Sequence, residues 1–188
     1  MLKRIIDATR RNHALEHGTV SIMLGRTGPN LRLVGRAVSD GFYIYGRVPT
    51  DLLAECADEA LSRFHRGEGS LAVTPLCGTN IAVAGLLAGA LSTMAMGGER
   101  RLERLPNVFS AAMLGIVISQ PAGRWVQRHL TTRPDLINVR IVGIRRGLGG
   151  RVHKVQTAIV EEGPVSPNGA AILDLSAPVA QLDGASDF

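Results

Sequence analysis

The stretch "NIAVAGLLAGALSTMAMGG", residues 80–98, decides the fold because it carries no charged side chain, and it lies in a charge-free run from Gly69 to Gly98. A helix needs about 20 mostly apolar residues to cross a bilayer. Helices of soluble proteins rarely run this long without a polar face. The run therefore predicts a transmembrane helix, in preference to the buried core helix of a soluble protein.

A second uncharged segment, "LPNVFSAAMLGIVISQPAG" (residues 105–123), follows after a short polar link. Trp125 comes soon after it, with an arginine close on each side. Aromatic and basic residues of this kind gather where a span leaves the bilayer. The two segments together predict a transmembrane helical hairpin over residues 76–125, with the lipid bilayer as its partner.

Gly85 and Gly89 lie four residues apart in the first predicted span and so share one face of the helix. Small residues at this spacing allow a second helix to approach closely in lipid. We expect this face to contact the second span. We also expect it to be the surface through which the hairpin docks on a membrane-protein complex or on a second copy of the chain.

The distribution of basic residues bears on orientation, since cytoplasmic loops of membrane proteins carry an excess of Lys and Arg. Basic residues near the N-terminus and after the second span favour two cytoplasmic termini: Lys3, Arg4, Arg10, Arg11, Arg124, Arg128 and Arg133. The connecting link argues the other way, with Arg100, Arg101 and Arg104. Charges begin too early for a secretory signal peptide. We therefore expect a multi-pass protein of the cell membrane with both ends in the cytoplasm.

A basic chain often binds nucleic acid, but the composition argues against that partner here. The formal net charge is +5, while aromatic residues make up only 4% of the sequence. No basic stripe interleaved with aromatic residues occurs, so we expect no nucleic-acid partner. The two cysteines, Cys56 and Cys77, lie in unlike contexts and do not predict a disulfide framework.

Apolar periodicity predicts a mixed α+β portion on both sides of the hairpin. Before it, a helix over 2–24, a strand–turn–strand over 31–48 and a helix over 51–67 with Thr50 as its N-cap are expected. After it, "INVRIVGI" and "RVHKVQTAIV" flank "RRGLGG" as a β-hairpin. The predicted fold class is α+β with a transmembrane hairpin. Its parts are a cytosolic N-terminal portion (1–75), the two spans (76–125), a C-terminal β-hairpin segment (126–160) and a flexible tail (161–188).

The stretch "HALEH", residues 13–17, is the best candidate for chemistry. His13 and His17 are one helical turn apart, so both imidazoles project from one face and can hold one ion. With Glu16 they have the H-x-x-E-H spacing of inverted zincins. Zinc suits such a site because it accepts imidazole nitrogens tetrahedrally, and Glu16 would be a further ligand or the catalytic base for a bound water. The alternative is a solvated, Arg-flanked helix face at the membrane surface.

Two histidines need a third ligand, and Cys77 in "TPLCGTN" is the best candidate. It lies in a polar turn at the start of the first predicted span, at a depth that an N-terminal helix could reach. A thiolate is a common zinc ligand, although a free cysteine is often only a small buried apolar residue. Weaker candidate ligands are Glu55, Glu59 and Glu99.

The stretches "NHALEHGTV", "GFYIYGRV", "EALSRFHRGEGSLAV", "CGTNIAVAGLLAG" and "HLTTRPDL" together resemble an uncharacterised bacterial membrane family, a domain of unknown function, over about residues 10–144. The chain is more distantly similar to YqhQ-like membrane proteins, which carry H-G-A-E-H and, before their spans, H-P-x-C-G-T. This chain departs from that pattern at Thr74, where the YqhQ-like pattern has His. The resemblance implies a membrane protein with a similar polar site and no established activity. Carried over, the pattern falls on His13, Glu16, His17, Cys77, Gly78 and Thr79.

Two functions of different classes follow from these features. In the first, His13, His17 and Cys77 hold a zinc-like ion, and the chain is an accessory or scaffold subunit of a membrane complex. In the alternative, the protein is a membrane-associated zinc-dependent hydrolase, peptidase-like, with Glu16 as its catalytic base. A Cys ligand donates charge and weakens Lewis acidity, and the sequence shows no substrate cleft. The scaffold is therefore the preferred prediction, and enzymatic activity is left open.

Overall fold

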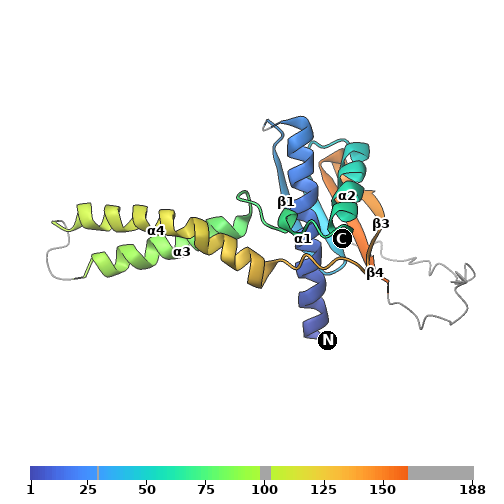
Figure 1. The fold of residues 1–188 in the computed structure, drawn as a ribbon. Helices are drawn as coiled ribbons and strands as arrows, with labels where there is room; N and C mark the ends of the chain where they lie inside the picture. The colour runs from blue at the N-terminus through green and yellow to red at the C-terminus, as the bar shows by residue number, and fades with distance from the viewer. Residues whose placement is uncertain (29, 98–102, 161–188) are drawn as a thin grey trace, which may run out of the picture.

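The structure is a computed structural model that describes residues 1–28, 30–97 and 103–160. Figure 1 shows two parts, an α/β body and a pair of long helices that projects from one side of it. We call these parts the body and the hairpin. The hairpin is inserted in the chain between the two halves of the body.

Two helices, α1 (Leu2–Thr27) and α2 (Thr50–His65), pack against each other in the body. α1 continues past its predicted end and stops at Gly28, whose φ of 84° lies in the left-handed region that favours glycine. Thr50 is the first helical residue of α2 and not its N-cap, which is Pro49. The Thr50 hydroxyl pairs instead with Nε2 of His153 at 3.1 Å.

Four strands form one antiparallel sheet in the order β1-β2-β4-β3, which are β1 (Leu33–Val38), β2 (Gly41–Gly46), β4 (Val152–Ile159) and β3 (Val139–Arg146). The sequence predicts two separate β-hairpins, and the structure joins them because β2 pairs with β4. Phe42 faces Val155 across this pairing, and both side chains are fully buried. A Cβ at Gly41 would lie 1.9 Å from the carbonyl oxygen of Val155, so this close approach requires glycine.

The hydrophobic core of the body lies where α1 and α2 pack on the sheet. Cys56 belongs to it, as the apolar stripe of α2 predicts. A short 3-10 helix, η1 (Gly69–Ala72), runs beside α1 and leads into the hairpin. The fully buried large apolar side chains include Leu15, Met23, Phe42, Ile44, Leu53 and Val155.

The hairpin consists of α3 (Gly78–Ala95) and α4 (Leu105–Val126), which pack along each other (Figure 1). Both helices are long and apolar enough to cross a membrane. No residue of α3 is buried, unlike the residues of a soluble core helix. α4 passes into a π-helical turn, η2 (Gln127–Thr131), before β3, and a 3-10 turn, η3 (Leu148–Gly150), separates β3 from β4.

The close contact between the two long helices does not use Gly85 or Gly89. A Cβ at either glycine would meet no atom of the described residues within 4 Å. The expectation that these glycines bring the two spans together is therefore wrong. The close approach occurs at Gly115 of α4, where a Cβ would lie 2.7 Å from the backbone of Ala88. The packing face of α3 is rotated away from the predicted face, which none of the described residues covers at Gly85 or Gly89.

Some expectations fall outside the described residues. They are the flexible tail over 161–188, the basic link residues Arg100 and Arg101, and the weaker candidate ligand Glu99.

Candidate metal centre

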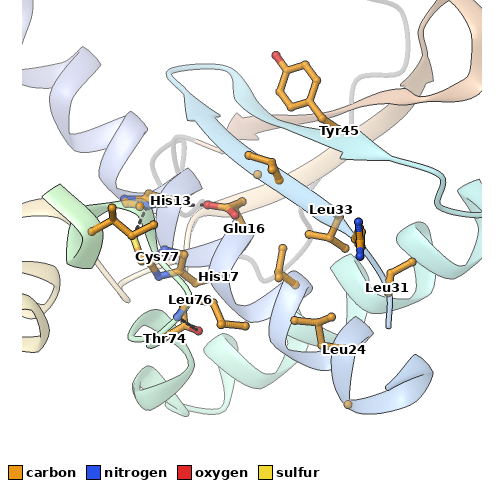
Figure 2. Close-up of a pocket in the computed structure, with 17 residues that line it drawn as sticks. His13, Glu16, His17, Leu24, Leu31, Leu33, Tyr45, Thr74, Leu76 and Cys77 are labelled. Carbon is orange, nitrogen blue, oxygen red and sulfur yellow. Dashed lines mark hydrogen bonds and ion pairs between the residues drawn. The ribbon is translucent and has the colours of Figure 1, made fainter. Parts of the chain in front are cut away.

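The body and the hairpin meet at a cluster of ionisable side chains. Figure 2 shows His13, Glu16 and His17 of α1 turned toward Cys77, which directly precedes α3. One ligand atom from each of His13, His17 and Cys77 lies within 4.8 Å of the others. The fold therefore brings together the three residues that the sequence selects as metal ligands, although the cysteine is far from the histidines in the chain.

Both histidines are oriented by backbone carbonyl groups. Nδ1 of His17 lies 2.7 Å from the carbonyl oxygen of Ala72, and Nδ1 of His13 lies 3.0 Å from that of Thr131. A carbonyl oxygen can only accept, so each Nδ1 carries the proton and donates it. With Nδ1 protonated, Nε2 is the ring nitrogen whose lone pair can bind a metal ion. Hydrogen bonding of one ring nitrogen to a carbonyl is the usual arrangement of a metal-ligating histidine.

Cys77 is held as a thiolate by its position. It is the N-cap of α3, and its Sγ accepts a hydrogen bond from the backbone N–H of Thr79 at 3.4 Å. Nε2 of His13 lies 3.6 Å from the same sulfur. Burial alone would raise the pKa of Cys77, but hydrogen bonds with His13, His17 and Thr79 lower it to about 5. A helix N-terminus favours the anion in the same direction.

Burial and hydrogen bonding shift the pKa of His13 in opposite directions. Burial lowers its pKa, but contacts with Cys77 and with the carbonyl of Thr131 outweigh burial and leave the pKa raised. In the metal-free chain, Cys77 and His13 therefore favour a thiolate and an imidazolium. A metal cation would replace the proton between them.

Glu16 lies beside the three ligands and is buried, with 7% of its surface exposed. Its Oε2 is 3.9 Å from Nε2 of His13. Burial raises the pKa of Glu16, and the neighbouring His17 and His13 oppose that rise. The carboxylate packs against β1, where a Cβ at Gly35 would lie 1.8 Å from Oε1. Any side chain at position 35 would displace it.

A buried polar network fixes the start of α3. The Gln127 side chain donates to Oδ1 of Asn80 at 2.7 Å and accepts from the backbone N–H of Thr74 at 2.9 Å. Asn80 in turn donates to the carbonyls of Thr74 and Pro75. Since these residues surround Cys77 in the chain, the network sets the position of its sulfur. Neither Gln127 nor Asn80 carries a sequence signal that marks it as a site residue.

A second set of contacts ties α1 to the segment after α4. The Arg10 side chain donates to the carbonyl of His129 at 2.8 Å, and the backbone N–H of Arg133 donates to the carbonyl of Arg10 at 3.0 Å. Arg133 also pairs with Asp7 at 3.3 Å. These contacts hold the carbonyl of Thr131 against His13, so four segments of the chain position one site.

Two of the weaker candidate ligands, Glu55 and Glu59, do not join the cluster. Glu55 and Glu59 both pair with Arg26, and Glu59 also pairs with Arg63. These ion pairs lie on the surface of the body, so the two carboxylates are not ligands.

A pocket of about 1010 Å³ opens beside the cluster, although the sequence shows no cleft. His13, Glu16, His17 and Cys77 line one part of it (Figure 2). Thr74 also lines it. Most of the remaining lining is apolar and comes from α1, from β1 and from the base of α3: Val20, Leu24, Leu31, Leu33, Val34, Leu76 and Ile81.

Comparisons with known proteins give a family and no activity. The model of a family described as a domain of unknown function, DUF6391, matches residues 8–144, well over half of the chain. An uncharacterized protein from Picosynechococcus sp. is 35% identical over 133 residues, which is 65% of this chain and 65% of that relative. The chain thus spans somewhat less than two thirds of the relative's length. No solved structure matches the chain.

Proposed function

The chain belongs to the DUF6391 family, a domain of unknown function, and we propose that it is an integral membrane hydrolase that binds a zinc-like ion through His13, His17 and Cys77. The observation that carries the proposal is that three ligand atoms within 4.8 Å of one another line the same pocket as a buried carboxylate, Glu16. Three protein ligands beside an accessible pocket are typical of catalytic zinc sites, while structural sites have four.

Insertion of the hairpin into a bilayer is supported by where its apolar side chains lie. Large apolar residues of α3 and α4 are exposed, including Ile81, Leu86 and Phe109 at 76%, 72% and 69%. In water this apolar surface would be unfavourable by about 25 cal/mol for each Å². A bilayer removes that penalty and places the metal centre at its surface.

The donor set fits zinc. Two neutral imidazoles and one thiolate are ligands that zinc accepts, and Cys₂His sites with a water are known among catalytic zinc centres. Each imidazole already has its Nδ1 bound to a carbonyl, which fixes the ring orientation. The thiolate form of Cys77 is present at neutral pH, because its pKa is about 5.

The bound ion would supply Lewis acidity and lower the pKa of a coordinated water toward about 7. Glu16 would accept the proton of the attacking water and return it to the leaving group, since it is buried beside the ligands and its pKa is raised by burial. Gly35 keeps the space in which that carboxylate lies. A peptidase-like or esterase-like hydrolysis is compatible with these roles.

A second candidate function is the accessory or scaffold subunit, in which the ion only joins α1 to α3. The open face at Gly85 and Gly89 favours it, since small residues without neighbours suit the approach of another membrane helix. The two candidates differ in what they require of Glu16. The hydrolase needs its carboxylate for proton transfer, and the scaffold needs it as a ligand or not at all.

The test is zinc content and hydrolysis in detergent-purified full-length protein and in Glu16→Gln. The proposal predicts that the variant keeps its zinc and loses hydrolysis of fluorogenic ester and peptide substrates. Glu55→Gln is the matched control, because Glu55 is a surface carboxylate outside the site. Loss of zinc together with thermal stability in Glu16→Gln would make Glu16 a ligand and favour the scaffold. A wild-type protein that takes up no zinc would contradict the metal site in both the hydrolase and the scaffold.

A further inference from the structure

The pocket beside the metal centre has an apolar part that the proposed function does not explain. Val20 and Leu24 of α1 and Leu31, Leu33 and Val34 on or next to β1 form it. Figure 2 shows Leu24, Leu31 and Leu33 away from the candidate ligands. The volume, about 1010 Å³, is at the upper end of the roughly 300–1,000 Å³ common for ligand pockets. A site for water and a small polar substrate alone would not need this extent of apolar wall.

The pocket is continuous with the base of the membrane hairpin. Leu76 and Ile81 line it and are themselves 69% and 76% exposed. They flank Cys77 at the point where α3 leaves the body. In Figure 1, β1 and the adjoining part of α1 lie on the side of the body from which the hairpin projects. If the hairpin spans a bilayer, this wall faces the bilayer surface.

The ionisable groups of the candidate site and most of the apolar lining occupy different parts of the pocket, whose wall also includes Arg32 and Tyr45. The ligands and Glu16 lie at one end, next to the start of α3, and the leucines of α1 and β1 lie at the other. A ligand that matches this division has one hydrocarbon segment and one polar, hydrolysable group at its end. A peptide would instead present backbone amides along its whole length, and burying them without partners is unfavourable.

We propose that the pocket holds an acyl chain of a membrane phospholipid, with the ester group of that chain beside His13, His17, Cys77 and Glu16. This inference rests on the proposed membrane insertion and names the substrate class of the proposed hydrolase. In the reaction, the bond between the acyl carbon and the ester oxygen breaks. Water supplies hydroxyl to the acyl carbon and, through Glu16, a proton to the departing alcohol oxygen.

The experiment uses full-length protein reconstituted in phosphatidylcholine vesicles that carry a photoreactive diazirine in one acyl chain. Crosslinked peptides are identified by mass spectrometry after illumination. The proposal predicts labelling of residues 20–35 of the body in addition to labelling of α3 and α4. Labelling confined to the hairpin would overturn the proposal, because acyl chains would then contact only the spanning helices.

Two strand valines give a matched pair of variants. Val34 lines the pocket at 66% exposure, and Val142 of β3 lies outside it at 65% exposure. Val34→Asp should lose most of the labelling in residues 20–35, since a charge in the apolar wall opposes the hydrocarbon. Val142→Asp should keep it. Val20→Trp, which fills the pocket from α1, should act like Val34→Asp. Labelling that neither pocket variant reduces would contradict the inference.

Zinc content, measured on the same samples, separates this inference from the proposed function. His17→Ala should lose zinc and keep labelling in residues 20–35, because the apolar wall is unchanged. A wild type that is labelled there but takes up no zinc would support the acyl pocket and contradict the hydrolase. A wild type that takes up zinc but is not labelled there would contradict the acyl pocket alone.

Discussion

The body and the hairpin use apolar side chains in opposite ways. In the body, Leu15 and Leu53 are fully buried among other side chains of the protein. In the hairpin, Ile81, Leu86 and Phe109 are mostly exposed although they are equally apolar. The body therefore buries its apolar residues in its own core, while the proposed membrane insertion would surround those of the hairpin with lipid. The candidate metal ligands come from both parts, so the cluster forms where the two meet.

The largest effect that separates the two parts is expected from shortening a leucine. Leu53→Ala removes atoms from a packed core and should destabilise the body by about 2–5 kcal/mol, since a cavity remains. Leu86→Ala, in the hairpin, should change unfolding little because its side chain packs on no core. Thermal unfolding in detergent measures both. Equal losses would mean that the hairpin is packed like the body.

A charged substitution tests whether the hairpin lies in an apolar environment. Leu86→Arg places a charge near the middle of α3 and should oppose membrane insertion by about 2.5–3.5 kcal/mol. Val142→Arg, at a similarly exposed site on the body, should leave insertion unchanged. Extraction of membranes with alkaline carbonate measures the inserted fraction. If Leu86→Arg inserts as well as the wild type, α3 does not cross the bilayer.

A smaller effect is expected from the contact between the long helices. Gly115→Leu would place side-chain atoms where the backbone of Ala88 lies and should destabilise the hairpin by about 1–3 kcal/mol. Gly89→Leu should not separate the helices, because the space around it is open. Distances between spin labels at the exposed positions Leu86 and Val117 measure the separation. A larger distance in Gly89→Leu than in Gly115→Leu would refute the observed packing.

The two cysteines differ in reactivity, because one lies in the body core and the other at the junction with the hairpin. Burial raises the pKa of Cys56 in the body core, while the pKa of Cys77 at the junction is lowered to about 5. A lowered pKa means that the anion predominates above that pH. In metal-free protein, the rate of Cys77 alkylation by iodoacetamide should therefore be half-maximal near pH 5 and should level off by about pH 7. Cys56 should stay unmodified, and added zinc should protect Cys77. A rate that keeps rising toward pH 9.0 would show an ordinary thiol.

The sequence predicts the elements of the fold better than their assembly. The helices and strands lie close to their expected positions, because apolar periodicity and the charge-free runs depend on local sequence. The pairing of β2 with β4 depends on burying Phe42 against Val155, which are far apart in the chain. The sequence likewise predicts two apolar helices, but not that Gly115, rather than Gly85 and Gly89, makes their contact.

In the candidate site too, the residues related by local sequence are predictable and the contacts between distant segments are not. His13, Glu16 and His17 are predictable because one helical turn relates them, and Cys77 by its turn before an apolar run. The carbonyls of Ala72 and Thr131 that orient the rings have no signature in the sequence, since every residue has a carbonyl. Gly35 within a strand is a weak signal of close backbone approach. The pocket arises from three elements together and has no local signal.

The central claim is that one ion joins α1 to α3 through two imidazoles and a thiolate. X-ray absorption at the zinc edge of the zinc-loaded, full-length protein tests it most directly. We expect nitrogen neighbours at about 2.0–2.1 Å and a sulfur neighbour at about 2.3 Å. We also expect loss of the sulfur signal in Cys77→Ser, while Cys56→Ser keeps it. A spectrum without sulfur, or one that Cys77→Ser leaves unchanged, would contradict the claim.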